Sequence, residues 1–194
     1  MHLWEVVLIS IGVSLGPLTI AIMKGANQRQ FPKHILVLIS IFLGGIQAFI
    51  LALGRMIGLV PMRYLNHKVI IEANKWIAAI ILLALGIKML RNTQKLIHLE
   101  ERLEASLNYK DIIILAARSG LDVLLLGNVF GFLEAPISSV YILFIIVSLF
   151  VGIGLWIGER FGNKYQLLLN SCSGMILIAM SIEVVISFFD MRGI

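Results

Sequence analysis

Cysteine is almost absent from this sequence. The single cysteine, Cys172, lies inside an apolar run and is best explained as a packing residue. One cysteine can form neither an internal disulfide nor a thiolate metal cluster. The sequence also has no zinc-ligand spacing, no phosphate-binding Walker loop and no catalytic-triad pattern. These absences argue against an enzyme.

Charged residues are scarce as well. They make up 14% of the 194 residues, whereas 59% are hydrophobic. A soluble domain typically has about 25% charged and about 45–50% apolar residues. The apolar residues fall in long runs that a soluble core of this size could not enclose. The sequence therefore predicts an all-α integral membrane protein whose main partner is the lipid bilayer.

The apolar runs predict six transmembrane helices. A helix needs about 20 mostly apolar residues to cross the hydrocarbon layer. Short loops are expected between the spans, for example Pro61–Lys68 after the second span and Glu134 alone after the fourth. The predicted spans are Val6–Met23, Ile35–Gly54, Val69–Leu90, Ile112–Leu133, Ala135–Gly158 and Tyr165–Phe189.

A charged stretch, Arg91–Asp111, separates the third span from the fourth. Leucines recur in it at helical spacing, which indicates an amphipathic helix on the membrane surface. A solvated linker is the alternative. The chain is accordingly divided into a first three-helix repeat (1–90), a cytoplasmic charged linker (91–111) and a second three-helix repeat (112–194).

Lysine and arginine are unequally distributed between the two sides of the predicted bundle. Ten lie in the loops after the first, third and fifth spans or at their edges, and five lie on the opposite side. Cytoplasmic loops are enriched in these residues. We therefore expect both termini to lie outside the cytoplasm. The same asymmetry accounts for the net charge of +5 without a nucleic-acid partner.

The two halves of the chain resemble each other. Residues 46–58 align with 146–158, and both stretches end in Gly-x-x-x-Gly, a spacing that lets helix backbones approach closely. Residues 83–89 align with 178–184, which places Lys88 opposite Glu183. Because each half has an odd number of spans, the second half is inverted relative to the first. Inverted repeats are typical of transporters, with the substrate site near the midplane.

Asp122 is the main candidate for a site residue. It lies near the middle of the fourth predicted span, and an ionisable group at membrane depth is a functional candidate. With the amide oxygen of Asn128 it would suit a hard divalent cation. Arg118, four residues earlier, shares its helix face. Arg118 either pairs with Asp122 or extends toward the cytoplasmic interface and leaves the carboxylate free.

Gly16 and Pro17 occupy the equivalent place in the first span. Proline removes a helix hydrogen bond and frees the carbonyl of Val13, which could then bind a cation. An ordinary proline kink is the alternative to a broken helix. Ser14 adds a hydroxyl, and Gln47 adds an amide oxygen from the second span at a similar depth.

Several segments together carry a family resemblance. They are Gly12–Pro17 with Met23–Gly25, Gly44–Gln47 with Gly54 and Gly58, Trp76–Ala78 with Leu85–Met89, and Gly120–Gly127. In order and spacing they resemble the bacterial manganese efflux pumps, a six-helix family of the lysine-exporter-like superfamily. The family has an aspartate where this chain has Gly16, and a small residue at Arg118. The family's functional carboxylate therefore carries over only at Asp122.

The resemblance implies a transporter of the bacterial plasma membrane that exports a divalent cation, with manganese as the expected substrate and no bound cofactor. Since no motif binds ATP, we expect gradient-driven alternating access. The departures at Gly16 and Arg118 leave two alternatives open. One is a non-transporting membrane scaffold, for example in sporulation, and the other is an exporter of another small solute. The coupling ion and a homo-oligomeric state also stay open.

Overall fold

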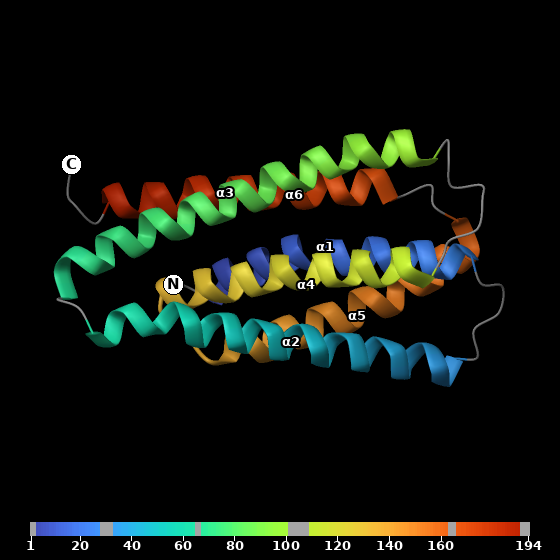
Figure 1. Cartoon of the computed structure of the whole chain (residues 1–194), viewed down its shortest axis with the longest axis horizontal. Helices are drawn as coiled ribbons and strands as arrows, with labels where there is room; N and C mark the ends of the chain where they lie inside the picture. Colours follow the sequence, from blue (N-terminus) through green and yellow to red (C-terminus); the bar gives the residue numbers. More distant parts are fainter. Residues whose placement is uncertain (1–2, 28–32, 65–66, 101–108, 163–165, 191–194) are drawn as a thin grey trace.

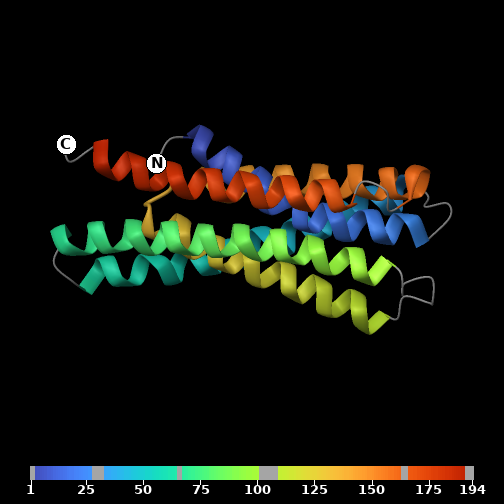
Figure 2. The same cartoon turned by 90° about the horizontal axis from the view of Figure 1, so that it is seen from above.

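The chain folds into a bundle of long helices. A computed structural model describes residues 3–27, 33–64, 67–100, 109–162 and 166–190, which form six α-helices and no strand. The helices lie lengthwise beside one another, and α1 begins at the end of the bundle where α6 ends (Figures 1 and 2). They are α1 (Leu3–Asn27), α2 (Lys33–Tyr64), α3 (His67–Glu100), α4 (Tyr109–Phe132), α5 (Ser138–Phe161) and α6 (Gln166–Asp190).

The described part of the chain contains five helices that are long and apolar enough to cross a membrane. Only α4 is not among them. It has 24 residues, but its described apolar part, Ser119–Phe132, is shorter than a span. Large apolar side chains such as Phe42, Met56 and Ile145 cover the outside of the bundle, where lipid replaces water. The predicted all-α, multi-pass membrane fold is confirmed.

Two helices run further than the apolar pattern indicates. α2 continues through Pro61 to Tyr64, so most of the predicted loop 61–68 is helical. Proline removes only the bond to the residue four positions earlier, and a helix can pass through it. α3 continues to Glu100, so residues 91–100 of the predicted linker continue the helix beyond the candidate span, which ends at Arg91. Residues 101–108 of that linker lie outside the described residues, and its amphipathic character stays a prediction.

The link between α4 and α5 is longer than the single residue Glu134. α4 ends at Phe132 and α5 begins at Ser138. Glu134 has a φ of 49°, in the left-handed region, and the amide of Ala135 donates to the carbonyl of Phe130. A tight turn of this kind closes the C-terminal end of α4. The turn itself therefore shortens the helical part of the predicted fifth span.

Helices from different halves of the chain make the most extensive contacts. α1 packs mainly on α5, α2 on α4 and α5, and α3 on α6. In Figure 1, α3 and α6 lie side by side although they are far apart in the sequence. The repeat relates α1 to α4, α2 to α5 and α3 to α6. When each helix is replaced by its repeat equivalent, the same helix pairs result. The arrangement is compatible with the predicted inverted repeat.

The predicted Gly-x-x-x-Gly pairs lie at two equivalent interfaces. A Cβ placed on Gly58 of α2 would lie 2.5 Å from the carbonyl oxygen of Asn128 on α4. A Cβ placed on Gly158 of α5 would lie 2.1 Å from the carbonyl oxygen of Ile22 on α1. Both helix pairs therefore touch backbone to backbone, as small residues in membrane helices allow.

The contact between α3 and α6 has a matching internal register. A Cβ on Gly86 would lie 3.0 Å from the carbonyl oxygen of Gly174, and the hydroxyl of Ser181 donates to the carbonyl of Ala79 at 2.8 Å. The alignment of residues 83–89 with 178–184 matches Gly86 to Ser181, and the same shift matches Ala79 to Gly174. The two contacts are thus equivalent under the repeat, which supports its register.

Candidate cation site

Asp122 faces the interior of the bundle. It is 7% exposed and lies on α4 among buried apolar residues. Ser119, one turn earlier on the same face, is also buried, and its Oγ lies 3.9 Å from the position of a Cβ on Gly16 of α1. α4 therefore meets α1 beside Asp122. A carboxylate at this place is enclosed by helices from both halves of the chain.

Lys88 is a partner of Asp122. The Lys88 ammonium, on α3, donates to Oδ1 of Asp122 and forms an ion pair with it. Sequence reasoning considered Arg118 for this role, and the side chain of Arg118 lies outside the described residues. Pairing within one helix follows from spacing along the chain, whereas pairing between α3 and α4 depends on tertiary packing. One feature of the sequence could have pointed to Lys88. It is a lysine near the end of an apolar run, and the repeat aligns it with Glu183.

Met89, the next residue of α3, contacts α1 and α6. Its Cε lies 3.5 Å from the position of a Cβ on Gly16, so the methionine fills the space beside the glycine. Its sulfur accepts a hydrogen bond from Ser173 of α6, whose hydroxyl also lies within hydrogen-bond distance of the Gly12 carbonyl. Two consecutive residues of α3 thus contact Asp122 on α4 and Gly16 on α1.

α1 is helical from Leu3 to Asn27, with Pro17 inside it, so the first span is a continuous helix and not a broken one. Pro17 still has no amide hydrogen to donate to the carbonyl of Val13. The hydroxyl of Ser14 donates to the carbonyl of Ser10 in its own helix, which leaves the hydroxyl oxygen able to accept. Oxygen atoms remain at this level of α1 without a break in the helix.

Gln47 is buried, and its Oε1 has no hydrogen-bond partner in the described structure. It lies on the α2 face that packs on α4, because the carbonyl oxygen of Leu51, one turn later, lies 2.4 Å from the position of a Cβ on Gly127. A buried amide oxygen without a protein partner is able to bind a cation. Gln47 is therefore kept as a candidate ligand.

Asn128 lies apart from the other candidates. Its amide nitrogen donates to the carbonyl of Leu124 at 3.0 Å, within its own helix. The helical rise places it about 9 Å beyond Asp122 along α4. Its backbone packs against Gly58 at the interface with α2. The contacts recorded for the described residues do not bring Asn128 to Asp122.

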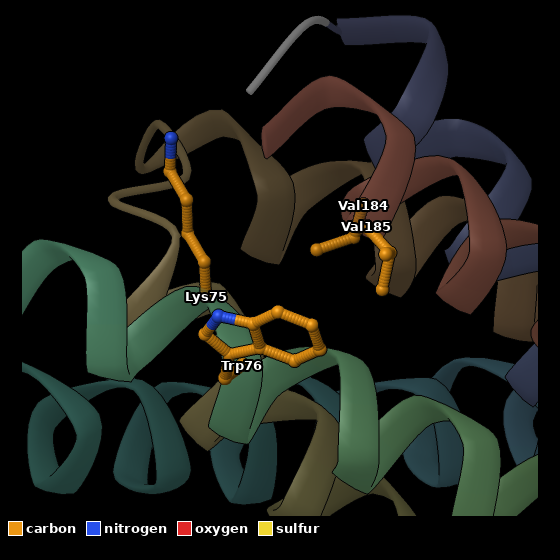
Figure 3. Close-up of a pocket in the computed structure, with 4 residues that line it drawn as sticks. All are labelled: Lys75, Trp76, Val184 and Val185. Carbon is orange, nitrogen blue, oxygen red and sulfur yellow. The ribbon is translucent and has the colours of Figure 1, made fainter. Parts of the chain in front are cut away.

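A metal centre built from many acidic or histidine ligands is not present in the described part of the chain, where no group of three or more His, Cys, Asp or Glu residues comes together. Elsewhere, Lys75 and Trp76 of α3 line a narrow depression with Val184 and Val185 of α6 (Figure 3). Helical rise separates Lys75 from Lys88 by roughly 20 Å along α3. The depression is therefore distinct from the Asp122 region.

A helical membrane bundle with an ion pair between its two halves, one partner buried, is an arrangement typical of membrane transporters. Residues 30–185 match the model of the family described as "Putative manganese efflux pump". The chain belongs to this family, and the resemblance seen in its motifs is confirmed. No solved structure matches the chain.

Curated relatives agree over nearly the full length. A protein of Desulfitobacterium hafniense is 30% identical over 190 residues, covering 97% of both chains. One from Methanosphaera stadtmanae is 28% identical over 191 residues, covering 95% of this chain and 99% of its own. One from Clostridium botulinum is 30% identical over 196 residues, covering 96% of this chain and 95% of its own. The first two are named "Putative manganese efflux pump MntP", and the third "Putative manganese efflux pump MntP 2".

Proposed function

We propose that this chain exports manganese across the membrane. The observation that carries the proposal is the buried carboxylate of Asp122, which already holds a cation, the ammonium of Lys88. Carboxylate, carbonyl and water oxygens are the ligands that Mn²⁺ accepts in proteins. Family membership and the names of the relatives support manganese over other divalent cations.

Asp122 would supply the charged ligand of the transported ion. The hydroxyl of Ser119, the carbonyl of Val13 and the hydroxyl of Ser14 are neutral oxygens near the contact between α1 and α4. Gln47 would supply an amide oxygen from α2. A site with one carboxylate binds a divalent cation less tightly than a site with two. The cation is cargo here, and the proposal includes no resident cofactor.

Transport would proceed by alternating access of the two three-helix repeats, driven by an ion or proton gradient. We place the chain in the bacterial plasma membrane with both termini outside the cytoplasm, on the strength of the lysine and arginine distribution. A reporter fused after Ile194 tests this orientation. A fusion that is active only in the cytoplasm would reverse it.

The function is tested in a manganese-sensitive host that lacks its own exporter. The chain should raise manganese tolerance and lower cellular manganese, and Asp122→Asn should abolish both effects because the charged ligand is lost. Glu159→Gln is the matched control, since Glu159 is an exposed carboxylate at the end of α5. The quantity measured is cellular manganese at equal amounts of membrane-inserted protein.

The two alternatives predict different results in the same assay. A non-transporting scaffold would leave cellular manganese equal to that of the empty-vector control. An exporter of another solute would leave manganese unchanged while conferring tolerance to a different ion or small molecule. Either result would refute manganese export.

A further inference from the structure

Lys88 and Asp122 are unequally enclosed. The side chain of Asp122 is 10% exposed, whereas that of Lys88 is 34% exposed. The carboxylate is attached by a short side chain to a buried face of α4, and the ammonium reaches it from α3 on a flexible four-carbon chain. If the pair separates, the ammonium is therefore the group that moves.

A metal ion bound at Asp122 would compete with this ammonium. Both are cations that need the same carboxylate, and two cations at one carboxylate repel each other strongly where water is excluded. Lys88 must therefore leave before a metal ion can bind closely. The occupied and empty carriers differ in which cation neutralises Asp122.

We propose that Lys88 is a tethered counter-cation, which the transported metal displaces from Asp122 and which returns to the carboxylate once the metal has left. This inference rests on the proposed function. The metal-free carrier then reorients with the Lys88–Asp122 ion pair at the site. Without the lysine, it would reorient with one positive charge fewer beside the buried carboxylate, and removing one partner of a buried charge is costly.

The position of Lys88 also connects the site to helix packing. Its neighbour Met89 contacts Gly16 on α1 and Ser173 on α6. Lys88 and Met89 are consecutive residues of α3, so the turn that carries the counter-cation also packs against α1 and α6.

Two transport modes distinguish a counter-cation from a structural ion pair. Net transport of Mn²⁺ into empty proteoliposomes requires the carrier to return without metal, whereas exchange of Mn²⁺ between equally loaded compartments requires only the metal-loaded carrier. For purified Lys88→Met we expect net transport to fall by about tenfold or more, equivalent to a barrier raised by about 1.4 kcal/mol. Exchange should persist, with half-saturation at a lower Mn²⁺ concentration.

Three variants control this experiment. Lys88→Arg keeps the positive charge and should retain net transport. Lys75→Met removes a lysine from the same helix at the depression of Figure 3 and should leave both modes unchanged. The double change Lys88→Met with Asp122→Asn replaces the ion pair by neutral groups. It should fold, by thermal unfolding in detergent, and transport no Mn²⁺ in either mode.

The outcomes separate this inference from the proposed function. Parallel loss of net transport and exchange in a folded Lys88→Met variant would show a structural role and refute the counter-cation. Unchanged net transport would refute it as well. If the wild-type chain moves no Mn²⁺ in either mode, the proposed function itself fails, and the counter-cation fails with it.

Discussion

Gly54 on α2 and Gly127 on α4 are so close that neither position has room for a side chain. A Cβ on Gly127 would lie 2.9 Å from the Cα of Gly54, and a Cβ on Gly54 would lie 3.0 Å from the Cα of Gly127. The same α4 carries Asp122. This contact between the two halves therefore holds the helix of the candidate site against α2.

Alanine at either glycine should destabilise the bundle. A Cβ at Gly54 meets the carbonyl oxygen of Leu124 at 2.2 Å, and a backbone atom cannot yield as a flexible side chain can. Overpacking of this kind costs about 1–3 kcal/mol. Thermal unfolding in detergent should show lower midpoints for Gly54→Ala and Gly127→Ala. Gly45→Ala is the control, because no atom lies within 4 Å of its Cβ position, and an equal shift there would contradict the packing argument.

Gly16→Asp should be accommodated and should raise manganese export. Its Cβ would meet Met89 Cε at 3.5 Å and Ser119 Oγ at 3.9 Å, which are ordinary contacts. A second carboxylate beside Asp122 would bind a divalent cation better than one does. Manganese tolerance of a sensitive host measures the gain, which Asp122→Asn should cancel.

The control for that change is Gly12→Asp. A Cβ on Gly12 would lie 3.1 Å from Ile176 and 3.2 Å from Leu177, so aspartate there should reduce the amount of folded protein. Combining Gly16→Asp with Arg118→Ala should raise tolerance further, because a neighbouring positive charge opposes cation binding. No gain from either Gly16 variant, at normal expression, would argue against a cation site between α1 and α4.

Arg55→Ala should weaken the turn between α4 and α5. The Arg55 guanidinium donates from Nη2 to the carbonyl of Ala135 at 2.8 Å, and Ala135 is fully buried. Loss of a hydrogen bond from a charged donor costs about 1.5–3 kcal/mol. Thermal unfolding of the purified protein should reveal the loss, while Arg91→Ala, at an exposed arginine, should have little effect. Equal midpoints for the two variants would show that the bond does not stabilise the fold.

Ser181→Ala should produce a smaller loss at the interface of α3 and α6. Its hydroxyl donates to the carbonyl of Ala79 across the interface. Such bonds between membrane helices contribute about 0.6 kcal/mol on average. Ser187→Ala is the matched control, because Ser187 donates within its own helix. If both contacts stabilise the same interface, the loss of stability in the double variant Ser181→Ala with Gly86→Ala should differ from the sum of the two single losses.

The number and class of the helices could be predicted because the bilayer demands long apolar runs, and the sequence shows them plainly. Helix ends could not, because α2 and α3 extend beyond their apolar runs, where hydropathy says nothing about helicity. Asp122 was found from the cost of burying a charge. Its partner Lys88 was missed, since contacts between helices arise from packing and not from spacing along one helix. Met89, which fills the space beside Gly16, was missed for the same reason.

The pairing of α1 with α5 and of α3 with α6 also bears on synthesis. A ribosome delivers the first three helices into the bilayer before the helices that cover their packing faces have been translated. Until then, the glycine faces of these helices meet lipid or the insertion machinery instead of their partners. A truncated chain that ends before α6 would leave α3 without its main packing partner. Quality-control proteases of the membrane would recognise such a product as an unassembled bundle. Completion of the last helix is therefore the step that commits the chain to its fold.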